Sequence, residues 1–150
     1  MRALLDVNVL IALLDAERDC HESARECREW FKVNRWFGWA SCPLTENGVV
    51  RFMTLPSYRK PLQRKAEDVI GALRLTRESS DHRFWADDLS RSDPNVFTAN
   101  RIRGSKQITD IYLLALAVKH NGWLATFDTR ISLDAVVGAT PAHLAVIESS

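Results

Sequence analysis

The pattern of apolar and polar positions changes twice in the first part of the chain. The mainly apolar residues at 2–5 are typical of a short buried strand, and the longer apolar run at 8–14 favours a helix. Over 20–35 the apolar side chains recur three and four positions apart, which predicts an amphipathic helix. The chain is therefore expected to begin with one strand and two helices.

The middle of the chain repeats this alternation. A second strand is expected at 37–41, and Pro43 then suits the first turn of a helix that continues through residue 53. The spacing of apolar residues at 62–76 predicts another amphipathic helix, and 82–85 is expected to form a third strand.

The last part is expected to hold a buried helix and two more strands. A short helical piece is expected at 87–90, followed by a loop at 91–105. A nearly continuous apolar run predicts a buried helix over 105–120. The segments 123–126 and 143–147 are then expected to be the fourth and fifth strands.

Strands that alternate with helices favour a parallel sheet with helices on both faces. We therefore predict a single α/β domain over residues 1–150, with three α/β/α layers and about five parallel strands. In such sheets ligands bind at the carboxyl ends of the strands.

Composition limits the class of protein. With 150 residues, 46% of them hydrophobic and 26% charged, the chain is typical of a globular domain. No apolar run approaches the length of a membrane span and no signal-peptide cleavage site is evident, so a cytoplasmic protein without membrane contact is expected. The net charge of +1 means that nucleic-acid binding would depend on local basic patches. Three cysteines without a CxxC pair argue against a disulfide framework.

Two aspartates directly follow predicted strands. Asp6 comes after an apolar run, and Asp128 comes after the fourth strand, so both are expected at the carboxyl edge of the sheet. Burying a carboxylate without a partner costs free energy, so such positions need a reason. Simpler interpretations stay open, because Asp6 can cap the next helix and Asp128 can be a turn residue.

Glu46 and Asp110 lie on predicted helices among apolar neighbours. Both have apolar residues at positions i+3, i+4 and i+7, which share their face of the helix. Both also fall in a first turn, where the helix dipole by itself favours acidic residues.

These four acidic residues come from separate segments that begin or end near one edge of the sheet. Carboxylates gathered there raise one another's pKa unless a cation lies among them. Oxygen ligands suit Mg²⁺ or Mn²⁺, which can activate water and stabilise a phosphoryl transition state. The combination predicts a phosphodiester hydrolase whose catalytic and metal-binding residues are Asp6, Glu46, Asp110 and Asp128.

Three segments resemble those of a known family. They read LLDVNVLIALLD from Leu4, CPLTENGVVRFM from Cys42 and TDIYLLALAVKHNGWLATFD from Thr109. Together they resemble the PIN-domain ribonucleases, and in particular the virulence-associated protein C toxins of bacterial toxin–antitoxin pairs. The resemblance spans essentially the whole chain. It implies a five-stranded parallel sheet, a Mg²⁺- or Mn²⁺-dependent endoribonuclease, a cognate antitoxin and a homodimer.

The resemblance also assigns residues. It matches Asp6, Glu46, Asp110 and Asp128 to the acidic quartet of the family, and it matches three polar positions that support the quartet to Asn8, Thr109 and Thr126. Some relatives carry a further acidic residue soon after the last aspartate, whereas Thr129, Arg130 and Ile131 follow it here. That difference leaves a second metal site open.

Two basic stretches are candidates for contact with the RNA substrate. Arg101, Arg103 and Lys106 lie just before Asp110, where contact with phosphates would position RNA over a metal. The stretch 58–65 is also basic, and its Tyr58 suits stacking on a base. Both stretches are also compatible with ordinary solvent-exposed connections.

Two other functions remain open at this point. A phosphoacceptor receiver domain shares the architecture and an acidic Mg²⁺ pocket, but it requires an aspartate at the end of its third strand. A non-catalytic α/β binding module would use the acidic residues for structure or for a basic partner.

Overall fold

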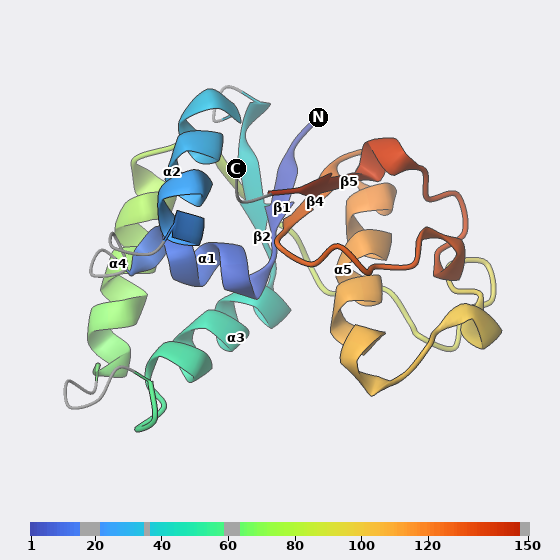
Figure 1. Cartoon of the computed structure of the whole chain (residues 1–150), viewed down its shortest axis with the longest axis horizontal. Coiled ribbons are helices and arrows are strands. Elements are labelled where there is room, and N and C mark those ends of the chain that lie inside the picture. The colour runs from blue at the N-terminus through green and yellow to red at the C-terminus, as the bar shows by residue number, and fades with distance from the viewer. Residues whose placement is uncertain (16–21, 35–36, 59–63, 148–150) are drawn as a thin grey trace.

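The structure, a computed structural model, describes residues 1–15, 22–34, 37–58 and 64–147 of the chain (Figure 1). Within these residues, five strands form one parallel sheet in the order β3-β2-β1-β4-β5. The strands are β1 (Ala3–Leu5), β2 (Trp39–Ser41), β3 (His82–Phe84), β4 (Trp123–Thr126) and β5 (Leu144–Val146). The predicted α/β class with five parallel strands is confirmed.

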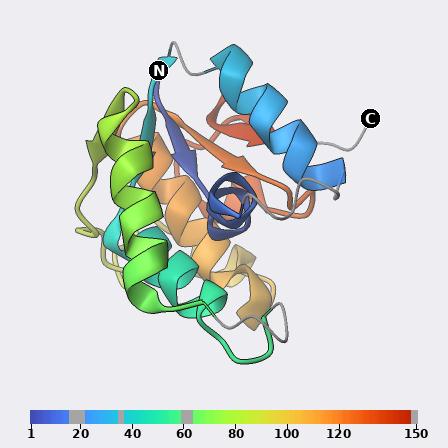
Figure 2. The same ribbon diagram turned by 90° about the vertical axis from the view of Figure 1, so that its left-hand side faces the viewer.

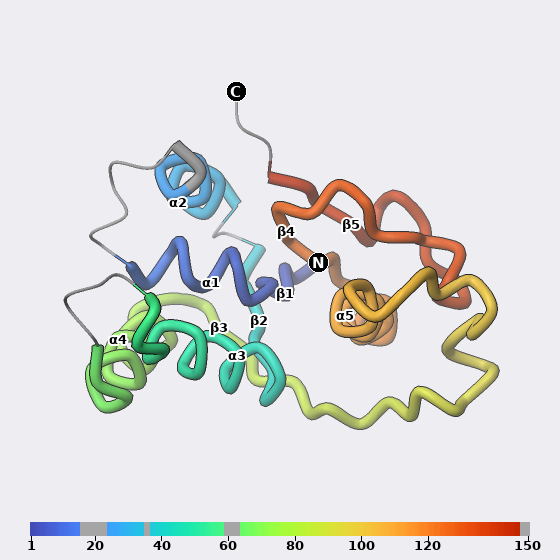
Figure 3. The backbone as a smooth tube through the Cα atoms, turned by 60° about the horizontal axis from the view of Figure 1, so that its bottom comes forward, coloured from blue at the N-terminus to red at the C-terminus, as the bar shows by residue number. Residues whose placement is uncertain are grey.

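Helices cover both faces of the sheet. The α-helices of the described residues are α1 (Val7–Leu14), α2 (Glu22–Asn34), α3 (Pro43–Met53), α4 (Ala66–Glu78) and α5 (Ile108–Lys119). Four 3-10 helices also occur in this part of the chain: η3 (Ala99–Arg101), η4 (Ser105–Gln107), η5 (Leu133–Ala135) and η6 (Pro141–His143). Figures 1 and 3 show α5 on one side of the sheet and α1, α2 and α4 on the other.

The two hydrophobic cores follow the alternation of side chains along the strands. Leu4 of β1 belongs to the core under α5, whereas Ala3 and Leu5 belong to the core under α1 to α4. Figure 2 shows α1 almost end-on between α2 and α4. Helix α1 is therefore central to its layer, and four of its residues are buried.

Strand order places two chain segments beside each other at one edge. β1 pairs with β2 on one side and with β4 on the other, and its last residue, Leu5, lies opposite Ala125 of β4. Because these strands are parallel, the residues that follow them emerge at the same edge of the sheet. That edge is where open α/β sheets bind ligands.

Some expected elements differ from those observed. The helical piece expected at 87–90 is wrong: the segment is irregular, and the Asp87 carboxylate accepts a hydrogen bond from the Leu44 N–H at the start of α3. The helix expected at 105–120 begins as η4 and becomes α-helical only at Ile108. No helix among the described residues is long and apolar enough to cross a membrane.

Candidate active site

Asp6 is a buried carboxylate at the junction of β1 and α1. It is the N-cap of α1, and its Oδ1 accepts a hydrogen bond of 2.7 Å from the Val7 N–H. Its Oδ2 accepts one of 2.7 Å from the hydroxyl of Thr126, the last residue of β4. Only 5% of the residue is exposed, and this burial raises its pKa, with a further contribution from the negative charge of Asp128. The capping function and the place in an acidic site therefore belong to the same residue.

Asp110 and Asp128 lie close to Asp6. Asp110 is in the first turn of α5, and Asp128 follows β4 by two residues, with its N–H donating to the Thr126 hydroxyl at 3.1 Å. Burial raises the pKa of Asp110 to about 7, and the charges of Asp6 and Asp128 together with a hydrogen bond to Asp128 add to the effect. Burial and neighbouring negative charge thus both oppose the ionisation of Asp6 and Asp110.

The three aspartates open into a cavity of about 470 Å³. We call this cavity the acidic pocket; it is lined by Asp6, Val7, Asn8, Ile11, Phe52, Tyr58, Thr109, Asp110 and Asp128. Asn8 and Thr109, two of the polar residues expected to support the site, are exposed at its wall. Thr126, the third, is fully buried and joins Asp6 to the turn that carries Asp128.

The donor set of the acidic pocket fits a hard divalent cation. Its ligands would all be carboxylate oxygens, and a cation among them would relieve the repulsion that raises the pKa of Asp110. No three His, Cys, Asp or Glu side chains among the described residues form a ready-made metal cage. Mg²⁺ does not require such a complete set of protein ligands, because it keeps several bound waters and in many proteins is held by only one or two carboxylates.

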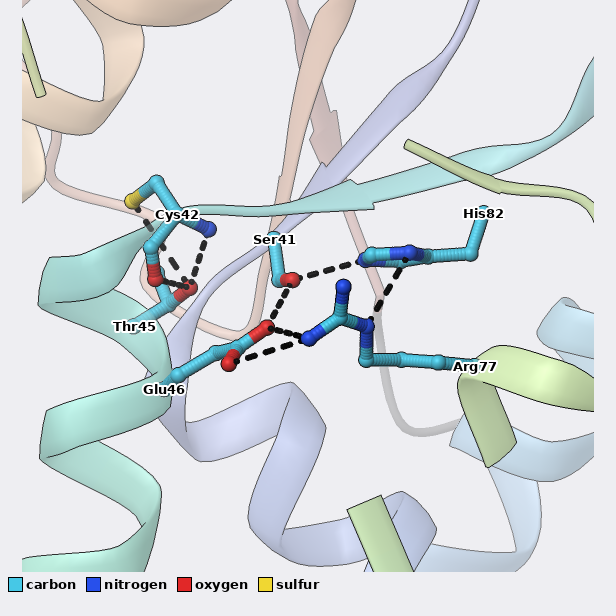
Figure 4. Close-up of polar contacts among 6 residues, drawn as sticks. All are labelled: Ser41, Cys42, Thr45, Glu46, Arg77 and His82. Atoms are coloured by element: carbon cyan, nitrogen blue, oxygen red, sulfur yellow. Dashed lines mark hydrogen bonds and ion pairs between the residues drawn. The ribbon is translucent and has the colours of Figure 1, made fainter. Parts of the chain in front are cut away.

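Glu46 lies apart from the three aspartates, in what we call the Glu46 cluster: Ser41, Glu46, Arg77 and His82 (Figure 4). The Ser41 hydroxyl donates to Glu46 Oε2 at 2.5 Å, and Arg77 Nη1 donates to the same oxygen at 3.3 Å. Glu46 lines a second cavity, of about 450 Å³, with residues of α4, but it does not line the acidic pocket. Arg77 is therefore its counter-charge.

The hydrogen bonds of the Glu46 cluster assign the tautomer of His82. Arg77 Nε donates to Nδ1 of the imidazole at 3.3 Å, so the proton of a neutral ring lies on Nε2, which is 2.7 Å from the Ser41 hydroxyl oxygen. Burial lowers the pKa of His82 to about 4, and the positive charges of Arg77 and Arg2 act in the same direction. The four side chains form a closed ring of donors and acceptors.

Close packing of α3 on α1 brings the backbone near Glu46 toward the acidic pocket. A Cβ at Gly48 would lie 2.7 Å from Val7 Cγ2, so only glycine allows this approach without a shift. Val7 is the neighbour of Asp6 and itself lines the acidic pocket. The carboxylate of Glu46 is turned toward Arg77, but the helix that carries it borders the site.

The basic residues expected to bind RNA lie beside Asp128, around a cavity that is separate from the acidic pocket. A small cavity of about 160 Å³ is lined by Arg103, Lys106, Gln107, Asp128 and Arg130. Arg101 and Arg103 each approach Asp134 at 3.9 Å and remain more than half exposed. Of the second basic stretch, residues 59–63 lie outside the described residues, and Arg64 pairs with buried Asp15 at 2.8 Å.

The sequence did not reveal several residues of this region. Phe52, Arg130 and the cluster partners Ser41, Arg77 and His82 carry no local signal, because each meets its partner through the tertiary fold. Tyr58 did carry a signal in the sequence, because it lies in a basic stretch and suits stacking on a base. Phe84 ends β3 and Trp85 follows it, at the position where a receiver domain requires its aspartate, so the structure does not support that alternative.

Comparison with known proteins gives one consistent result. The family model described as PIN domain matches residues 3–136. Ribonuclease VapC44 of Mycobacterium tuberculosis is 47% identical over 147 residues, which cover 98% of this chain and 100% of the relative. Ribonuclease VapC38 of the same organism is 43% identical over 86% of each chain. Ribonuclease VapC29 is 38% identical over 88% of this chain and 90% of the relative.

Proposed function

The chain belongs to the PIN-domain family, and from that premise we propose that it is a metal-dependent endoribonuclease, the toxin of a toxin–antitoxin pair. The relatives are named ribonucleases, and two of them match 98% and 86% of the chain. One structural observation carries the proposal: buried Asp6 lies with Asp110 and Asp128 at the carboxyl edge of β1 and β4, where burial and then the charges of Asp6 and Asp128 raise the pKa of Asp110. The family match over 3–136 supports treating residues 1–150 as one domain.

In this proposal Asp6, Asp110 and Asp128 hold Mg²⁺ or Mn²⁺. Such a cation supplies activation of water and stabilisation of the charge that develops on the phosphoryl group. Thr126 fixes the carboxylate of Asp6 and the turn before Asp128, so that both remain aimed into the acidic pocket. Without a cation, the pKa of about 7 leaves the Asp110 carboxyl group about half protonated at neutral pH, and this group shares a hydrogen bond with Asp128.

Glu46 is the fourth carboxylate of the proposed catalytic set. Its helix borders the acidic pocket at Gly48, which supports this assignment, but its carboxylate is paired with Arg77. We therefore propose that Glu46 joins the site only after it leaves Arg77. Asn8 and Thr109, exposed at the pocket wall, would orient the substrate or a water molecule beside the carboxylates.

Positive charge beside Asp128 would hold the RNA backbone. Arg103 and Lys106 line the small cavity that shares Asp128 with the acidic pocket, and Arg101 lies nearby through its contact with Asp134. Phosphate contacts of this kind position a substrate without reading its sequence. Arg130, exposed and beside Asp128, adds a fourth cation to this surface.

The remaining parts of the proposal concern partners and place. We propose in addition that the chain has a cognate antitoxin, forms a homodimer and acts in the cytoplasm, as its similarity to the VapC ribonucleases suggests. Exposed apolar side chains such as Phe37, Leu75 and Phe84 offer contact surface for a protein partner.

Cleavage of RNA tests the proposal. The purified chain, Asp6→Asn and Asp110→Asn are incubated with RNA and Mn²⁺ or Mg²⁺, with and without EDTA. We expect metal-dependent cleavage that falls by at least about a hundredfold in both variants. The matched control is Asp88→Asn, because Asp88 is an exposed carboxylate that pairs with Lys119 at the opposite end of α5 from Asp110. Equal residual cleavage in all four proteins would indicate a contaminant and contradict the proposal.

A further inference from the structure

The acidic pocket has a second, aromatic side that the proposed chemistry does not use. Besides the three aspartates, the lining of the acidic pocket includes the aromatic rings of Phe52 and Tyr58. We propose that these two rings form a subsite for one unpaired nucleobase of the RNA whose phosphate lies at the aspartates. This inference rests on the proposed function and specifies how the substrate is held.

Phe52 is the exposed member of the pair. It lies in the last turn of α3, and 44% of it is accessible, although the neighbouring Met53 is buried in the core. Its ring meets that of Tyr58 edge to face, with centroids 5.2 Å apart and planes at 67°. A large apolar side chain left exposed at the wall of a cavity is a candidate for ligand contact.

Tyr58 is held in place by contacts of its hydroxyl group and of its ring. Its hydroxyl donates to Asp15 Oδ2 at 2.5 Å, and Asp15, which is fully buried, also pairs with Arg64 at 2.8 Å. The Arg64 guanidinium carbon lies 5.7 Å from the centre of the Tyr58 ring. The ring is therefore positioned before any substrate binds, so binding would cost little side-chain entropy.

The chemistry of the acidic pocket favours a base over other occupants. A phosphodiester near Asp6 and Asp110 carries a nucleoside on each side, and each nucleoside ends in a flat π-system. Stacking on aromatic rings is worth about 1–3 kcal/mol per base and depends little on which base is present. Only an unpaired base can present its face in this way, so the subsite selects single-stranded RNA.

Binding of two probes tests the inference without relying on cleavage. The protein carries Asp110→Asn in every measurement. Its affinity for a fluorescent oligoadenylate decamer is compared with its affinity for a decamer that has the same ribose–phosphate backbone and no bases. We expect the bases to tighten binding by about fivefold or more. Adding Phe52→Ala should reduce this ratio to below about twofold and leave the affinity for the abasic decamer unchanged.

Two further variants make the result specific. Phe52→Leu keeps an apolar side chain at the end of α3 and removes only the ring. It should lower the ratio of the two affinities as Phe52→Ala does, and it keeps the test valid if alanine disturbs folding. Phe37→Ala is the matched control, since Phe37 is a 54% exposed aromatic residue whose ring packs on Trp123, the first residue of β4 and so at the other edge of the sheet.

The outcomes are distinguishable from those of the proposed function. If the ratio between the two probes survives in both Phe52 variants, or if the abasic decamer loses as much affinity as oligoadenylate, the subsite is refuted. The same holds if bases add nothing to binding in the parent. Failure of the proposed function would appear instead as a wild-type chain that does not cleave RNA.

Discussion

The two ends of α1 carry two buried carboxylates with opposite surroundings. Asp6 precedes the helix and is 5% exposed; Asp15 follows it and is fully buried. Asp15 receives hydrogen bonds from Tyr58 and Arg64, so its charge is compensated by a cation and a hydroxyl. Asp6 receives hydrogen bonds from the Val7 N–H and the Thr126 hydroxyl, but its charged neighbours include the carboxylates of Asp110 and Asp128.

The difference separates a structural carboxylate from a functional one. A buried ion pair loses stability when one partner is removed, because the other charge stays buried without compensation. Buried carboxylates that repel one another should instead gain stability when one of them is neutralised, unless a cation binds.

The same substitution at the two ends of α1 should have opposite consequences. Asp15→Asn should lower the free energy of unfolding by about 3 kcal/mol, because it leaves Arg64 without its buried counter-charge. Asp6→Asn should leave stability within about 0.5 kcal/mol of wild type or higher, since asparagine is an equally good N-cap. Urea unfolding in EDTA measures both, and a destabilisation of similar size at both positions would remove the contrast.

Removal of the Thr126 hydroxyl should weaken the site more than the fold. Thr126→Val takes away the donor to Asp6 and the acceptor for the Asp128 N–H, and we expect Mn²⁺ affinity to fall by about tenfold or more. Stability should fall by about 1 kcal/mol.

The matched control is Thr45→Val. Thr45 is also fully buried, and its hydroxyl bonds to the Cys42 backbone at the start of α3, where Figure 4 shows it. A similar loss of stability is expected there, with Mn²⁺ affinity unchanged by calorimetric titration. Equal losses of Mn²⁺ affinity in both variants would mean that Thr126 acts only through the fold.

The pH dependence of stability should show the raised pKa of Asp110, which arises first from burial and then from the charges of Asp6 and Asp128, with a smaller effect than the substitutions above. The pKa of Asp110 is about 7 in the folded protein against an ordinary value of 3.8, so the folded state holds a proton that the unfolded state has lost. In EDTA, this group should therefore make stability fall as pH rises from about 4 to about 7.

Comparison with a variant isolates this contribution. His82 has a pKa lowered to about 4, so its contribution is lost in the opposite direction, as pH falls from about 6.5. Asp110→Asn removes only the first contribution, and its stability relative to wild type should rise steadily with pH in denaturant titrations. A constant difference across that range would show that the pKa of Asp110 is not raised in the folded protein.

The sequence predicted best what depends on local pattern. The helix from Pro43 to Met53 and the strand from Trp123 to Thr126 have the expected bounds, because a proline start and a bounded apolar run are read within one segment. The same logic places Asp6 and Asp128 after adjacent strands. The helical piece at 87–90 failed because Asp87 bonds to Leu44, a partner 43 residues away.

Partners distant in sequence also account for what was missed at the site. Apolar neighbours of Glu46 predicted that it points inward, and it is half-buried, but periodicity does not reveal that Arg77 holds its carboxylate. Asp15 directly follows the apolar run of α1, and its buried carboxylate pairs with Arg64, 49 positions later. Charge compensation is decided by the tertiary fold, so the contrast between the two carboxylates appears only in three dimensions.

Thermal unfolding with and without Mn²⁺ tests most directly whether the acidic pocket binds a cation. Near pH 7 in EDTA, Asp110→Asn should be at least as stable as wild type, because it removes one of the repelling charges. Saturating Mn²⁺ should stabilise wild type and Asp88→Asn, by about 2.7 kcal/mol at a hundred times the dissociation constant, and should have much less effect on Asp110→Asn. Equal stabilisation of all three proteins by Mn²⁺ would contradict the account.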